Sequence, residues 1–124
     1  MKKLSKKADI FILLTHQVYD LDLGLAKKID GLDLIVGSHS QTKIESPEEV
    51  NKTLIVQAGK SGYYVGVVEI KTNKGKVVEK SGRIDTMKFD MPDDPRIMKM
   101  IEEYETKTGR MNMRKKKLKE KADG

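Results

Sequence analysis

The apolar run Leu34-Ile35-Val36, with the polar residues that follow it, constrains the fold more than any other part of this 124-residue chain. The run has no polar alternation and ends at Gly37, which is typical of a strand covered on both faces. Serines then flank His39 and lead to Gln41. Segment 32–42 is therefore predicted to contain a buried strand that presents an imidazole and a carboxamide at its carboxyl end.

A second apolar run, at residues 10–14, ends in a similar way just before His16, so each of the chain's two histidines follows a predicted strand. The amphipathic stretch 22–29 between the runs is predicted to be a crossover helix with Asp22 as its N-cap. If the strands are parallel neighbours, both histidines lie at the edge where open α/β sheets bind ligands. Each histidine alone is more simply a structural residue, and only the paired placement makes a metal-ligand role an equal alternative.

The sequence after the second histidine predicts a loop and then three strands. Residues 46–52 are polar, contain a proline and are predicted to be an exposed loop with solvated glutamates. Runs rich in β-branched and aromatic residues follow at 53–57, 63–71 and 76–83, and Asn73-Lys74-Gly75 is a hairpin signal between the last two. These runs predict an antiparallel meander that completes the sheet.

The last predicted element is a helix that begins at Asp94-Pro95, with the aspartate as N-cap and the proline at the first helical position. Apolar residues then recur at helical spacing and predict a stripe that packs against the rest of the domain. The stripe consists of Ile97, Met98, Ile101 and Tyr104.

The net charge of +6 comes from one end of the sequence. Residues 1–105 carry 17 lysines and arginines against 17 acidic residues, whereas residues 106–124 carry 8 against 2. The basic residues of this tail are not interleaved with aromatic ones, so a solvated, disordered tail is preferred to one that binds nucleic acid. Residues 1–7 are a polar lead that is also expected to be disordered.

The chain contains no cysteine, which excludes disulfides and thiolate metal sites. The apolar run at residues 10–14 follows a lysine-rich start but is too short for the core of a signal peptide or for a membrane span. Neither a signal peptide nor a membrane span is therefore expected in this chain, which as it stands would be cytoplasmic, and the localisation is left unknown.

Three motifs in order resemble one known family. They are Leu14-Thr15-His16, Gly37-Ser38-His39-Ser40-Gln41 and Thr53-Leu54-Ile55-Val56-Gln57-Ala58-Gly59. This set resembles the C-terminal half of the calcineurin-like metallophosphoesterase domain, with the 5'-nucleotidase family as the closest branch. The resemblance implies an α/β fold, namely the C-terminal half of a four-layer α-β-β-α sandwich whose mixed sheet ends in an antiparallel meander plus a C-terminal helix. The partial domain is expected at residues 8–105, between the polar lead at 1–7 and the basic tail at 106–124.

The resemblance also implies a function, which is metal-dependent hydrolysis of phosphomonoesters or nucleotides. By position, His16, His39 and Gln41 match metal ligands of the family, whose complete domain holds two divalent metal ions. Imidazole suits several transition metals, so zinc, manganese and iron are not distinguished. Members of the family are often exported, so a parent protein of this chain could be exported too.

The family's Asp-x-His, bridging Gly-Asp and Gly-Asn-His-Glu motifs do not occur in this sequence. No catalytic residue is therefore assigned, the substrate-binding residues are unknown, and the chain is expected to be inactive without an N-terminal half.

Strands that are apolar on both faces need a partner that covers them. An N-terminal half or a second copy of the chain could supply that cover. The alternative to a partial enzyme is a non-catalytic remnant or an oligomerising interaction module, and a basic-tailed nucleic-acid binder is a weaker third.

Overall fold

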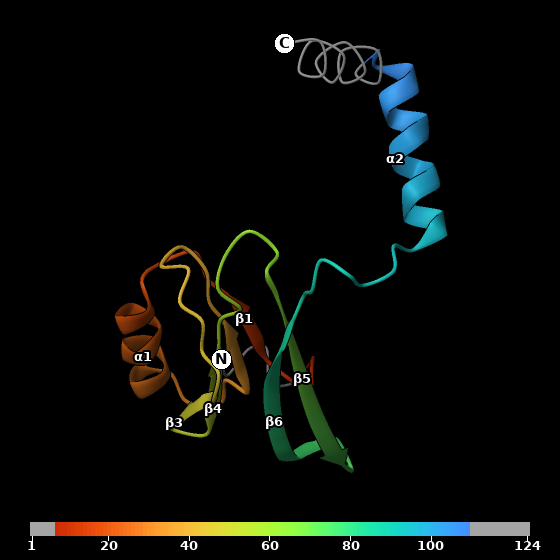
Figure 1. Cartoon of the computed structure of the whole chain (residues 1–124). Coiled ribbons are helices and arrows are strands. Elements are labelled where there is room, and N and C mark those ends of the chain that lie inside the picture. The colour runs from red at the N-terminus through yellow and green to blue at the C-terminus, as the bar shows by residue number, and fades with distance from the viewer. Residues whose placement is uncertain (1–6, 110–124) are drawn as a thin grey trace. The chain divides into compact units, whose positions relative to one another are not determined.

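The computed structural model describes residues 7–109 (Figure 1). They fall into two units, the first ending at Lys88 and the second beginning at Phe89. Within the described residues, the first unit contains six strands and one helix, and the second contains one helix. No helix within this range is long and apolar enough to span a membrane.

Four short strands form a mixed sheet in the first unit. They are β1 (Ile12–Leu14), β2 (Leu34–Val36), β3 (Glu48–Val50) and β4 (Thr53–Val56), and they lie in the order β1-β2-β4-β3. Strands β1, β2 and β4 are parallel, and β3 runs antiparallel to β4. Helix α1 (Tyr19–Lys28) connects β1 to β2. The predicted α/β class and the parallel pairing of the strands that precede the two histidines are thus confirmed.

Helix α1 covers one face of this sheet (Figure 1). Ile35 of β2 and Ile55 of β4 are fully buried in one cluster with Ala26 of the helix and Leu32. Full burial of a side chain of this size stabilises a fold by roughly 1.5–3 kcal/mol. This small core holds the carboxyl ends of β1, β2 and β4 at one edge of the sheet.

The opposite face of the sheet packs against a hairpin of β5 (Tyr64–Asn73) and β6 (Lys76–Thr86). A Cβ added at Gly82 of β6 would lie 3.6 Å from the Val56 side chain, and an apolar cavity of about 150 Å³ remains between the two sheets. The predicted hairpin turn is confirmed, with positive φ angles of 50° at Lys74 and 74° at Gly75. The predicted meander is wrong, because β4 pairs with β2 and β3 and the hairpin forms a separate sheet.

Helix α1 begins earlier than the sequence predicted. Its first residue is Tyr19, its N-cap is Val18, and Asp22 lies inside the helix, fully buried, instead of capping it. The Tyr19 hydroxyl donates a 2.7 Å hydrogen bond to Glu48. Burial, together with this contact, raises the pKa of Tyr19 to about 12. The first helical turn is therefore fixed by a tertiary contact with β3 that local sequence does not show.

Strand β3 occupies residues 48–50 of the exposed loop predicted at residues 46–52. Besides the Glu48 contact, the Glu49 carboxylate lies 3.5 Å from Nζ of Lys80 on β6. The β3–β4 turn contains Asn51, whose side chain donates to the Ala26 carbonyl of α1 at 3.2 Å and to Asp30 at 2.9 Å. A polar strand is stable at this sheet edge because its side chains have partners on the neighbouring elements.

The second unit contains helix α2 (Pro95–Lys107). The Asp94 carboxylate accepts a 2.8 Å hydrogen bond from the Arg96 backbone, and Pro95 opens the helix, as predicted. The packing of the apolar stripe of α2 against the rest of the domain stays a prediction. Residues 1–6 and 110–124 lie outside the described residues, and so do the predictions made for almost all of the polar lead and most of the basic tail.

Candidate metal centre

His16 and His39 meet at the carboxyl edge of the parallel strands. His16 follows β1, and the Thr15 amide before it donates a 3.0 Å hydrogen bond to the Val36 carbonyl of β2. His39 follows β2, and its Nδ1 lies 3.2 Å from Nε2 of His16. The ring centroids are 5.0 Å apart and the ring planes are inclined by 70°. Two residues 23 positions apart in the sequence thus form one exposed pair of imidazoles.

Gln57 fixes the loop that carries His39. Gln57 is 3% exposed. Its Oε1 accepts hydrogen bonds from the Ser40 hydroxyl at 2.9 Å and from the Thr42 backbone. Its Nε2 donates a hydrogen bond to the Ser38 carbonyl at 3.0 Å. His39 and Gln41 have positive φ angles of 68° and 55°. Such angles are unfavourable for residues other than glycine, so the surrounding contacts must hold them.

The sequence reasoning did not single out Gln57 as part of the site. A usable signal existed, because Gln57 is the polar residue that ends a third apolar run, in the manner of His16 and His39.

Asp22 lies beneath the same loop. Its Oδ1 accepts a 2.7 Å hydrogen bond from Nε2 of Gln17, the residue directly after His16. Its Oδ2 faces Gly37, where an added Cβ would lie only 2.5 Å away. The buried carboxylate therefore touches both segments that carry the histidines.

Gln41, the third predicted ligand, lies on the same loop with an exposed side chain. No hydrogen bond joins Gln41 to either histidine within residues 7–109. The structure therefore brings together two of the three predicted ligands, and the metal-binding role of all three stays a prediction.

The histidine pair suits one metal ion in its spacing but not in its number of donors. Two nitrogens bound to the same tetrahedral zinc ion at about 2.0–2.1 Å are roughly 3.3–3.4 Å apart. The 3.2 Å separation of the two imidazole nitrogens is close to that value. The part of the chain that the structure describes holds no cluster of three or more His, Cys, Asp or Glu residues able to bind a metal. A complete centre needs ligands beyond these two imidazoles.

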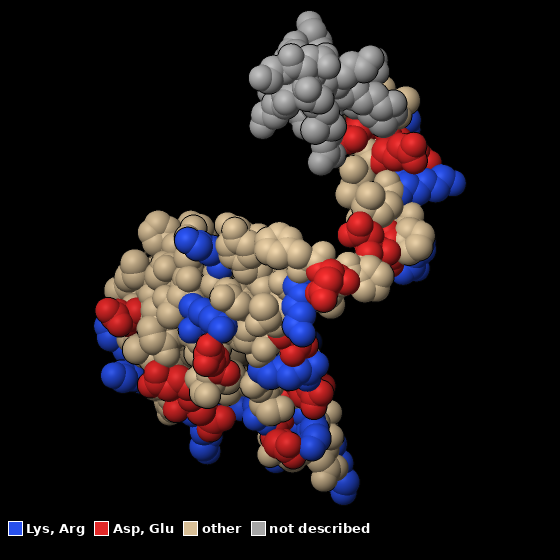
Figure 2. Space-filling view, in the orientation of Figure 1, with Lys and Arg blue, Asp and Glu red and all other residues tan. Residues whose placement is uncertain are grey.

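Four basic side chains of the first unit lie within ion-pair distance of carboxylates, namely Lys43, Lys71, Lys80 and Arg83. Lys43, close to the His39 loop in sequence, lies 4.5 Å from the centre of the Tyr64 ring and 2.6 Å from Glu45, which raises the pKa of the lysine. Figure 2 shows basic and acidic side chains interspersed over this unit. No continuous basic surface suited to nucleic acid is visible on this face of the unit.

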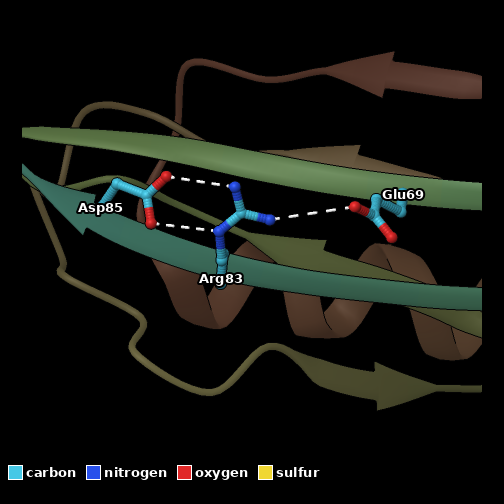
Figure 3. Close-up of polar contacts among 3 residues, drawn as sticks. All are labelled: Glu69, Arg83 and Asp85. Carbon is cyan, nitrogen blue, oxygen red and sulfur yellow. Dashed lines mark hydrogen bonds and ion pairs between the residues drawn. The ribbon is translucent and has the colours of Figure 1, made fainter.

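Arg83 of β6 is flanked by two carboxylates. Figure 3 shows its guanidinium between Asp85, at 3.1 Å and 3.3 Å, and Glu69, at 3.9 Å. An exposed network of this kind stabilises a fold by at most about 1 kcal/mol. With carboxylates on both sides, this guanidinium is poorly placed to attract a phosphate group.

Comparison with known proteins relates the chain to a nucleotide phosphoesterase and to 5'-nucleotidases. It is 38% identical over 77 residues to a trifunctional nucleotide phosphoesterase protein of Bacillus subtilis, a match that covers 60% of this chain and 5% of the relative. It is 28% identical over 115 residues to the 5'-nucleotidase of Bos taurus, covering 77% of this chain and 20% of that protein. No protein-family model matches the sequence.

A solved structure gives the same relation. The 5'-nucleotidase precursor of Thermus thermophilus superimposes with a TM-score of 0.69 and 25% identity, over 86% of this chain and 25% of that one. The chain is therefore related to a part of the 5'-nucleotidase and metallophosphoesterase proteins. It spans only 5% to 20% of the length of the two curated relatives described above.

Proposed function

We propose that this chain is part of a metal-dependent phosphomonoesterase related to 5'-nucleotidases and that it contributes His16 and His39 to the metal centre, with Gln41 as a third ligand. The observation that carries the proposal is the 3.2 Å approach of the two imidazoles at the carboxyl ends of neighbouring parallel strands. Bound divalent metals in such centres polarise phosphoryl oxygens and lower the pKa of water. The residues of this chain hold and orient the imidazoles for that role.

The remaining ligands would come from another protein segment that packs on β1. Strand β1 is at the edge of its sheet, and Ile12 and Leu14 on it are 53% and 75% exposed. An apolar edge strand of this kind is a site for further pairing. Its carboxyl end leads directly to His16, so a segment that covers β1 would also reach the histidines. The chain on its own is expected to show little or no turnover.

The test combines metal binding and activity in one sample. The purified chain is assayed with manganese or zinc on a chromogenic phosphomonoester, first alone and then mixed with the N-terminal half of a related metallophosphoesterase. We expect activity only in the mixture, and loss of that activity in His39→Ala but not in the surface variant Asp20→Asn. Robust turnover by the chain alone that is lost in His39→Ala would contradict the incomplete centre, and silence of the mixture together with no bound metal would contradict the enzymatic proposal.

The exposed apolar residues of β1 also favour a second candidate, a non-catalytic module that associates with its own copies. That function predicts a metal-independent dimer at low micromolar concentration. Sedimentation of the metal-free chain tests it, with Leu14→Lys expected to shift the dimer to monomer. A wild-type monomer at all concentrations would exclude this candidate.

A further inference from the structure

Among the described residues of the first unit, Asp22 is the one buried polar residue whose hydrogen-bonding capacity is left unsatisfied. The other two, Thr53 and Gln57, are paired: the Thr53 hydroxyl donates to the Leu32 carbonyl at 3.0 Å, and Gln57 bonds the His39 loop. Asp22 has 0% exposure, and its Oδ2 is the only buried side-chain nitrogen or oxygen in the described residues without a partner. A buried polar atom without a partner is costly, so its presence calls for an explanation.

The position of this carboxylate supplies one. On one side, Oδ1 accepts the hydrogen bond from Gln17, whose backbone continues directly from His16. On the other side, Oδ2 lies against Gly37, two residues before His39, at a distance that leaves no room for a Cβ. A Cβ at Gly37 would also lie 2.9 Å from Nε2 of Gln57, the donor to Ser38. Asp22 therefore stands between the two turns that aim the imidazoles.

We propose that Asp22 is a positioning residue that holds His16 and His39 in contact by fixing both turns from below. The effect of Asp22 on metal binding rests on the proposed function, whereas its effect on the contact between the two imidazoles does not. The rigid helix α1 carries the carboxylate, and its burial prevents the side chain from moving to other rotamers. Replacing a residue that does not bind the metal but orients its ligands commonly lowers metal affinity about 10- to 100-fold.

The test uses the metal-free chain first. Nuclear Overhauser contacts between the ring protons of His16 and His39 report the pair, and contacts between Ile35 and Ile55 report the core. In Asp22→Asn the contact between the rings is expected to be lost while the core contacts persist. The control Asp20→Asn changes an exposed carboxylate on the same helix and should leave both unchanged. Persistence of the ring contact in folded Asp22→Asn, or its absence in the wild type, would overturn the proposal.

A second variant decides the matter if Asp22→Asn does not fold. Gln17→Leu removes only the donor to Oδ1 and leaves the buried carboxylate in place. Loss of the ring contact in folded Gln17→Leu supports the positioning role, and its retention contradicts it.

Zinc titration of the same samples then separates the two proposals. The expected result is binding by the wild type and a loss of about 10-fold or more in affinity in Asp22→Asn. No zinc binding by a wild-type chain that shows the ring contact, even when it is mixed with the N-terminal half of a related metallophosphoesterase, would overturn the proposed function and leave the positioning role of Asp22 standing. Equal zinc affinities of wild type and folded Asp22→Asn would overturn the role of Asp22 and leave the metal site standing.

Discussion

Substitution of Gly37 by alanine tests how tightly the candidate site is packed. The added Cβ would lie 2.5 Å from Oδ2 of Asp22 and 2.9 Å from Nε2 of Gln57, both on buried side chains. Gly37 is not among the glycines with positive φ, so the backbone accepts alanine and the effect comes from space alone. Overpacking typically costs about 1–3 kcal/mol. Displacement of Gln57 from the Ser38 carbonyl would add about 1 kcal/mol.

We therefore expect Gly37→Ala to lower the free energy of unfolding by about 2–4 kcal/mol, the sum of these two costs. The assay is urea unfolding followed by circular dichroism. Gly24→Ala is the matched control, because Gly24 lies within α1 and an added Cβ there meets no atom within 4 Å. Removal of a mid-helix glycine should raise stability by about 1 kcal/mol. Wild-type stability of Gly37→Ala, or a change of the same sign in both variants, would refute the close packing of the loop against Asp22.

Three further predictions concern contacts that hold the sheet. Tyr19→Phe loses the hydrogen bond to Glu48 and should be destabilised by about 1 kcal/mol at neutral pH. Because the folded-state pKa of Tyr19 is raised to about 12, the stabilisation by this tyrosine is present below about pH 10 and is lost as the pH rises toward 12. The unfolding curves of wild type and Tyr19→Phe should therefore converge as the pH approaches 12. Asn51→Gly keeps the positive φ of 49° but removes two hydrogen bonds, so thermal melting should show that the free energy of unfolding falls by about 1–2 kcal/mol. The loss should be larger for Asn51→Ala, because alanine is strained at a positive φ. The side chain of Lys80 is 8% exposed, donates a hydrogen bond to the Lys52 carbonyl and lies near Glu49. Lys80→Ala should therefore increase proteolysis at the β5–β6 hairpin before global unfolding. The control Lys74→Ala, at the exposed turn, should not.

The parallel strands and their histidines were predictable because each strand that precedes a histidine leaves a continuous apolar run in the sequence. Residues 10–14 and 34–36 both show it, and the topology rule for open sheets then places His16 and His39 at one edge. The observed 3.2 Å contact agrees with that placement. The relation to 5'-nucleotidases follows from the order of short motifs, and the comparisons support it independently.

The errors lie where tertiary partners decide the structure. Glu48 and Glu49 look like loop residues in the sequence, yet they form β3 because Tyr19 and Lys80 are there to contact them. Asp22 looks like a helix cap because aspartate commonly has that role, and its buried position depends on Gly37, fifteen residues away. Strand pairing is equally non-local, so the sequence could predict the β5–β6 hairpin but not its separation from β4.

The central claim, that His16 and His39 bind one metal ion together, is tested most directly by zinc titration of the ¹⁵N-labelled chain with detection of the imidazole nitrogens. We expect Nε2 of His16 and Nδ1 of His39, the two nitrogens now 3.2 Å apart, to shift together at the same zinc concentration. We also expect His16→Ala to weaken zinc binding at His39. Shifts at different zinc concentrations, an unchanged response of His39 in His16→Ala, or no response of either ring would contradict a shared site.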